Sequence, residues 1–131
     1  MNQTGCIVKG ILWHQGESDT VSDTLTNTYE SKLIKLISDI RADIGDPKLP
    51  FVLGNLAEFY GNYVDHSHPD RVARIEKVKQ ILRSIPSKVP YTCFVESTGC
   101  SSPDKYNVHF DRKSYILLGK RYAKAIKKIL F

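Results

Sequence analysis

Seven consecutive residues near the start of the chain, Trp13 to Asp19, combine an indole, an imidazole, a carboxamide and two carboxylates. They follow an apolar run, Ile7 to Leu12, that has the composition of a buried strand. Desolvating so many polar groups costs free energy, so folding alone rarely concentrates them at a strand end. In α/β proteins, ligand crevices form outside the carboxyl ends of parallel strands. This segment is therefore the first candidate for a functional site.

A second candidate is His109, which lies just before the last amphipathic stretch of the chain. An imidazole can act as a general base near neutral pH, particularly when a carboxylate orients its ring. Glu17 and Asp19 are carboxylates from the first segment, while Asp104 and Asp111 are local ones. Taken alone, a histidine at this place is more typical of a surface residue near a helix N-terminus than of a catalytic base.

Three short apolar segments alternate with three amphipathic ones along the chain. The apolar segments are typical of buried strands and span residues 6–15, 50–57 and 89–96. The amphipathic segments repeat apolar residues at spacings of three and four and predict helices over 23–44, 70–85 and 111–130. Ser22 or Asp23 can cap the first helix, and Gly45 can end it.

This alternation predicts an α/β fold, a three-layer α/β/α sandwich built on a parallel sheet. Parallel strands bring their carboxyl ends to one edge of the sheet, so the loops that follow them should meet there. These loops span residues 16–22, 58–69 and 97–109. We therefore expect Glu17 and His109 at the same edge.

The composition indicates one globular domain. The chain has 131 residues, 41% of them hydrophobic and 25% charged. No apolar run approaches the ~20 residues that cross a bilayer, and no signal peptide is visible, so localisation stays open. The odd number of cysteines argues against a self-contained disulfide framework; we expect Cys6 and Cys93 in the core and Cys100 as an exposed loop thiol.

The net charge of +5 arises mainly from the last twenty residues. Cations near the end of a helix complement its dipole, and no aromatic–basic motif accompanies them. A solvated helix face therefore explains them better than nucleic-acid binding does. The cations concerned are Arg112, Lys113, Lys120, Arg121, Lys124, Lys127 and Lys128.

The loop after the second predicted strand offers two weaker candidates. The run from Asp65 to Asp70 alternates carboxylates and imidazoles, as a metal site can, but solvated residues ahead of a helix explain it better. No metal is expected. Tyr60 and Tyr63 are suited either to stacking on a sugar ring or to packing.

Four segments, in this order, resemble one family: Trp13 to Asp19, Leu49 to Phe59, Asn107 to Asp111 and Leu118 to Ala123. They are similar to the SGNH-type carbohydrate esterases, which include sialate O-acetylesterases and acetylxylan esterases. The resemblance covers the chain from about residue 5 to residue 125. It implies an SGNH hydrolase or flavodoxin-like fold and hydrolysis of sugar O-acetyl esters through a serine, without metal or cofactor.

The same resemblance assigns roles to several residues. It implies that His109 is the catalytic base and that Glu17 orients or stabilises it. Gln15 would lie near the oxyanion pocket, where an N–H stabilises developing negative charge. Trp13 and His14 would shape the pocket wall.

Two departures from the family pattern affect this assignment. Tyr106 stands where many members carry an aspartate three residues before the histidine, and a phenol cannot supply its charge. We expect Glu17 to take that role, with Asp104 as the possible supporting acid. The family's nucleophile lies in an upstream Gly-x-Ser turn, but no serine precedes Ser18, and Ser101 leads into Pro103 instead of a helix.

We therefore expect residues 1–131 to form a single, incomplete domain, the C-terminal part of such an esterase, inactive without its nucleophile. The substrate would be an acetylated carbohydrate, and neither nucleic acid nor membrane would be a partner. The bare sheet edge would be covered by the missing N-terminal segment or by another chain. The alternatives are a degenerate module that binds acetylated sugar without hydrolysing it and, more weakly, a basic nucleic-acid-binding domain.

Overall fold

The computed structural model describes residues 5, 7–62, 68–104 and 108–130. Its strands are β1 (Ile11–Trp13), β2 (Phe51–Gly54) and β3 (Thr92–Val95). Its α-helices are α1 (Asp23–Ile44), α2 (Pro69–Ser84) and α3 (Arg112–Leu130). Two short 3₁₀ helices, η1 (Glu17–Thr20) and η2 (Ile85–Ser87), complete the order of elements.

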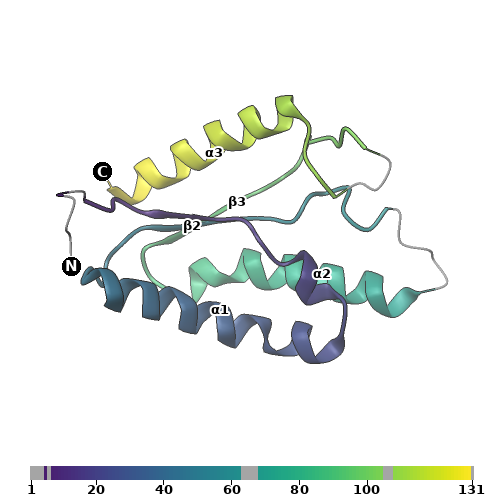
Figure 1. The fold of residues 1–131 in the computed structure, drawn as a ribbon, viewed down its shortest axis with the longest axis horizontal. Helices are drawn as coiled ribbons and strands as arrows, with labels where there is room; N and C mark the ends of the chain where they lie inside the picture. Colours follow the sequence, from purple (N-terminus) through teal and green to yellow (C-terminus); the bar gives the residue numbers. More distant parts are fainter. Residues whose placement is uncertain (1–4, 6, 63–67, 105–107, 131) are drawn as a thin grey trace.

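The sheet in the described part of the chain has the order β1-β2-β3, and both pairs are parallel. Helices α1 and α2 cover one face and α3 covers the other (Figure 1). The predicted α/β class with a parallel sheet between helical layers is thus confirmed. Because β2 lies in the middle, Phe51, Val52 and Leu53 are fully buried.

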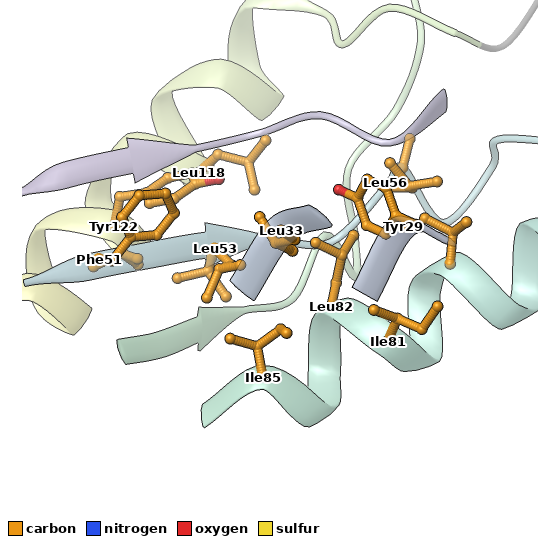
Figure 2. Close-up of a cluster of buried hydrophobic side chains, with 14 of the residues drawn as sticks. Tyr29, Leu33, Phe51, Leu53, Leu56, Ile81, Leu82, Ile85, Leu118 and Tyr122 are labelled. Carbon is orange, nitrogen blue, oxygen red and sulfur yellow. The ribbon is translucent and has the colours of Figure 1, made fainter. Parts of the chain in front are cut away.

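The core fills both sides of this central strand. From α1 and α2 it receives Tyr29, Leu33 and Leu82, and from the other face Leu118 and Tyr122 of α3 (Figure 2). In α1 and α3 the buried positions recur every three or four residues, as the helical spacing predicted. Cys93 and Cys100 are partly buried against this core, so Cys100 is less exposed than expected; Cys6 lies outside the described residues.

The helices were predicted to within two residues at each end, whereas the strands are shorter than predicted. Ser22 caps α1 by accepting a hydrogen bond from Leu25 N at 3.3 Å, and Gly45 ends it with a φ of 78°. The prediction for the first strand was wrong over residues 7–10, which precede the pairing of Ile11 with Phe51. Ile7 and Val8 there are 72% and 43% exposed, because no neighbouring strand or helix covers them.

Six of the seven cations in the last twenty residues are exposed on α3, as a solvated helix face requires. Arg121 is half-buried and donates to Glu96 O at 2.8 Å, which ties the helix to the end of β3. No helix in the described part of the chain is long and apolar enough to cross a membrane.

One buried cation fixes α1 to the amino ends of two strands. Arg41 donates to Leu49 O, Pro90 O and Tyr91 O at 3.0 to 3.1 Å, and only 8% of it is exposed. These carbonyls lie in the turns that lead into β2 and β3. The guanidinium therefore connects three segments that are distant in sequence.

We predict that Arg41→Met lowers the free energy of unfolding by about 2–3 kcal/mol, because it leaves buried carbonyls without their charged donor. Urea denaturation checks this value. The matched control is Arg83→Met, which removes a half-exposed ion pair with Glu96 and should cost less than ~1 kcal/mol. Equal losses for the two variants would contradict this account of Arg41.

Candidate active site

The end of β1 divides its polar side chains between the two faces of the sheet, because neighbouring strand residues point in opposite directions. His14 faces α3, where its Nδ1 lies 2.9 Å from Tyr122 Oη. Trp13 packs beside Phe51 on the other face, with a ring-centroid distance of 6.2 Å. Neighbouring residues of the segment Trp13 to Asp19 thus lie on opposite faces of the sheet, in two different environments.

Tyr122 links α3 to this strand end. Its hydroxyl donates to Trp13 O at 3.0 Å and also meets His14 Nδ1. Both contacts occupy the space above Gly54 at the end of β2. A Cβ built on Gly54 would lie 1.8 Å from Tyr122 Oη and 2.5 Å from His14 Nδ1, so only glycine fits there.

A cleft of about 590 Å³ opens between this strand end and α3. It brings together Glu17 from the first loop and His109 from the third, as the topology predicted. Both are described, yet no hydrogen bond or ion pair joins their side chains in the structure. The remaining wall is formed by His14, Val108, Phe110, Tyr115, Leu118, Gly119 and Tyr122.

Phe110 anchors the loop that carries His109. Its ring is buried, and its centroid lies 5.3 Å from that of His14, 5.5 Å from Phe59 and 5.9 Å from Tyr115. His109 itself is exposed. A rigid buried neighbour therefore positions an accessible imidazole at the mouth of the cleft.

Asp111 fixes the same loop from the other side. It accepts from Ser114 N at 2.7 Å, as a helix-capping carboxylate does, and from Ser101 Oγ at 2.6 Å. These hydrogen bonds, the Ser101 one foremost, lower the pKa of Asp111. Ser101 and Asp111 thus serve to hold the loop. Ser101 is therefore poorly suited to act as the nucleophile, and Asp111 is poorly suited to act as the acid beside His109.

The backbone of Glu17 is held while its side chain faces the cleft. Glu17 O accepts from Thr20 Oγ1 at 2.7 Å and from Tyr60 Oη at 3.2 Å. The preceding Gly16 has a φ of 146°, and a Cβ there would lie 2.9 Å from Val78, so this turn requires glycine.

Gln15 and Trp13 line a different, smaller hollow, of about 260 Å³, against α1. Gln15 Nε2 donates to Asp19 Oδ2 at 2.7 Å, and Gln15 O accepts from Tyr29 Oη at 2.8 Å. The structure therefore separates Gln15 and Trp13 from Glu17, His14 and His109. Asp19, considered as a partner of His109, is also on that side.

The second loop contributes packing. Tyr60 is only 5% exposed, so of the two alternatives for this residue, sugar stacking and packing, its burial fits packing. Tyr63 and residues 65–67 of the metal candidate lie outside the described residues. Within the described ranges, no three His, Cys, Asp or Glu side chains are grouped as a metal site would need.

The local acid candidate, Asp104, lies on the third loop beside Ser102 Oγ, which meets Asp104 Oδ1 at 3.4 Å and Asp104 N at 3.3 Å. It does not line the cleft. Tyr106 lies outside the described residues. Of the carboxylates considered for His109, Glu17 is the one that shares its cleft.

Sequence reasoning missed Tyr122, Gly54, Phe110 and Tyr115. By its spacing Tyr122 belongs to the apolar stripe of α3, together with Leu118, Ile126 and Ile129, and so looks like an ordinary core residue. Its hydroxyl was the available signal, because a buried tyrosine in an aliphatic stripe needs a hydrogen-bond partner. The partner itself, 109 residues away, follows only from the fold.

The His14 site also makes stability depend on pH. Burial lowers the pKa of His14 below its ordinary value of 6.5, and the charge of Glu17 partly opposes this shift. The unfolded chain therefore takes up this proton at a higher pH than the folded one. The contribution of neutral His14 to the free energy of unfolding is fully present above pH 6.5. It is lost as the pH falls from 6.5 toward the lower pKa of His14 in the folded protein.

We predict that His14→Phe loses less unfolding free energy than the wild type between about pH 7 and pH 5, since the variant lacks this proton uptake. Urea denaturation at the two pH values measures the difference. The control is His68→Phe at an exposed position, which should keep the wild-type loss. Identical pH dependence in wild type and His14→Phe would contradict the assignment.

Comparison with known proteins gives concordant results. The chain is 34% identical over 58 residues to an Arabidopsis thaliana protein named probable carbohydrate esterase At4g34215. This aligned segment covers 44% of the present chain and 22% of the relative. The crystal structure of the Arabidopsis protein AT4G34215 superposes with a TM-score of 0.79 at 24% identity, over 97% of this chain and 46% of that one. The chain thus spans less than half the length of these relatives.

A second solved structure, XAC1771 from Xanthomonas citri, described as a novel carbohydrate acetylesterase, has a TM-score of 0.63 at 22% identity. It matches 92% of this chain and 26% of its own. At these identities the two structures support the fold. A family model described as carbohydrate esterase, sialic acid-specific acetylesterase, matches residues 1–128. The chain therefore belongs to this carbohydrate esterase family.

Proposed function

We propose that this chain supplies the general base and its acidic partner for the hydrolysis of O-acetyl esters on carbohydrates, with sialate esters as the finer substrate class that the family description suggests. The observation that carries the proposal is the cleft that holds both His109 and Glu17. An exposed imidazole that shares a cleft with a carboxylate supplies the groups that serine-dependent acyl transfer needs. Glu17 is preferred to Asp104 because it faces the same cleft.

In the proposed reaction, a serine oxygen attacks the acetyl carbonyl while His109 takes the serine proton. The tetrahedral intermediate then collapses with cleavage of the bond to the sugar oxygen, and His109 gives that proton to this oxygen, which leaves as a hydroxyl group. Water attacks the acetyl-serine with His109 again as base, which releases acetate and restores the serine. Glu17 stabilises the imidazolium formed in each step.

We further propose that the serine comes from outside these 131 residues. Two observations support this proposal: within the described residues β1 is an edge strand that pairs with β2 alone, and its Leu12 is 57% exposed. Ser18 is exposed on η1, and Ser101 is bound to Asp111. An upstream segment or another chain that pairs with β1 would bring a serine to the carboxyl end of the sheet.

A second candidate function is sugar binding without hydrolysis. It is favoured by the wall of the cleft, which includes no serine among the described residues. In this case His109 and Glu17 would contact hydroxyl groups and would not transfer protons. The experiment below separates the two functions.

We predict that the 131-residue chain hydrolyses an aryl acetate at close to the buffer rate, whereas a version extended upstream to include a Gly-x-Ser segment is active. In the extended protein, His109→Asn should lower kcat by roughly 10²–10⁴-fold because the base is lost. Glu17→Gln should lower it by roughly 10²-fold, since the imidazolium loses its counter-charge. Release of aryl alcohol measures each rate.

The comparison variant is Ser101→Ala, which should lower kcat by less than about tenfold in the extended protein, because it removes one hydrogen bond that holds the His109 loop and not the nucleophile. Strong activity of the 131-residue chain that Ser101→Ala abolishes would overturn the proposal. An inactive extended protein that still binds acetylated sugar would favour the second candidate.

A further inference from the structure

The hydrogen bonds around Tyr122 determine which nitrogen of His14 carries the proton. The Tyr122 hydroxyl has one proton and donates it to Trp13 O at 3.0 Å. Its 2.9 Å contact with His14 Nδ1 must then be donated by the imidazole. His14 is therefore held with a proton on Nδ1 and a lone pair on Nε2.

Because Tyr122 occupies Nδ1, Nε2 is the ring nitrogen left for a ligand in the cleft. His14 lines it together with Glu17 and His109, and no described residue forms a hydrogen bond with Nε2. His14 is exposed as a residue, but desolvation of its ring lowers its pKa below the ordinary 6.5, which favours the neutral form. His14 thus offers a fixed acceptor to whatever occupies the cleft.

Aromatic surface lies beside this acceptor. Phe110 makes edge-to-face contacts with both His14 and Tyr115, so the three rings form one wall. Tyr115 is 59% exposed and lines the same cleft, whereas Tyr60 is buried. A sugar ring presents hydroxyl donors at its rim and C–H groups on its faces, which suits an acceptor next to an accessible ring.

We propose that His14 Nε2 and the ring of Tyr115 form the sugar-binding wall of the cleft, in which His14 accepts a hydrogen bond from a sugar hydroxyl. The proposal rests on the proposed function for the identity of the ligand. It gives His14 a binding role and leaves proton transfer to His109.

Gly54 provides independent support. A Cβ at this position would occupy the place of the Tyr122 hydroxyl, at 1.8 Å, and would approach His14 Nδ1 to 2.5 Å. The end of the central strand is thus shaped to admit this pair of side chains. The orientation of His14 depends on the backbone of β2 as well as on α3.

The first test is the tautomer of His14 in the 131-residue chain, read from long-range ¹H–¹⁵N spectra of the imidazole above pH 7. We expect protonated Nδ1 and unprotonated Nε2. Tyr122→Phe should produce a population with protonated Nε2, since the partner of Nδ1 is lost. The control is Tyr29→Phe, which removes a hydroxyl bound to Gln15 O and should leave the tautomer unchanged. Protonated Nε2 in the wild type would overturn the proposal.

The second test is binding of methyl β-D-xylopyranoside, a neutral sugar without an acyl group, followed by NMR titration of the same chain. We expect the His14 Nε2 resonance to shift on binding. His14→Phe keeps a ring against Phe110 and should weaken binding roughly three- to tenfold, the effect of one lost hydrogen bond. Tyr115→Ala should weaken it further, and His68→Phe should not change it.

Unchanged affinity in His14→Phe, or no binding of the pyranoside by the wild-type chain, would overturn the proposal. Neither test needs a nucleophile or ester hydrolysis. A chain that passes both tests but shows no esterase activity when extended would refute the proposed function and leave the sugar-binding wall intact. If the chain fails these tests while its extended form hydrolyses the ester, the sugar-binding wall is refuted and the proposed function stands.

Discussion

The hydroxyl of Tyr122 is the interaction on which the arrangement of the cleft depends. It joins the middle of α3 to the last residue of β1 and to His14, across a gap that only a glycine in β2 leaves open. Three elements from three parts of the chain thereby meet at one oxygen atom. Without this contact the apolar stripe of α3 would still pack on the sheet, but the helix would lose its hydrogen bond to the end of β1.

The loops of the cleft are supported in the same manner, by buried or hydrogen-bonded groups next to accessible ones. Phe110 is buried beside the exposed His109, and Asp111 is held by Ser101 and Ser114. The backbone of Glu17 is fixed by Thr20 and Tyr60. Reactive side chains thus remain free while their neighbours supply the order, which lowers the entropy cost of assembling the site.

Much of the fold followed from the sequence because its signals are local. The spacing of Leu33 and Ile37 defines a helix face, Ser22 and Gly45 mark its ends, and parallel strands bring their carboxyl ends to one edge. The extent of β1 did not follow, because Ile7 and Val8 look like strand residues whether or not a neighbour covers them. Pairing is a long-range property that an apolar run does not reveal.

The site was predictable in its location and less so in its detail. Topology alone places Glu17 and His109 together, but the alternation of β1 side chains sends Gln15 to the face opposite His14. Tyr60 and Tyr115 are both aromatic residues near the sheet edge, and only packing shows that the first is buried and the second accessible. The role of Tyr122 depends on a contact across 109 residues.

The central claim is that the Tyr122 hydroxyl and His14 act as a unit that fixes the cleft. A double-mutant cycle with His14→Ala and Tyr122→Phe tests it most directly, with the free energy of unfolding of each protein measured in urea above pH 7. The account predicts a coupling energy of about 1 kcal/mol, typical of a partly buried hydrogen bond. Strictly additive losses, with a coupling energy near zero, would contradict it.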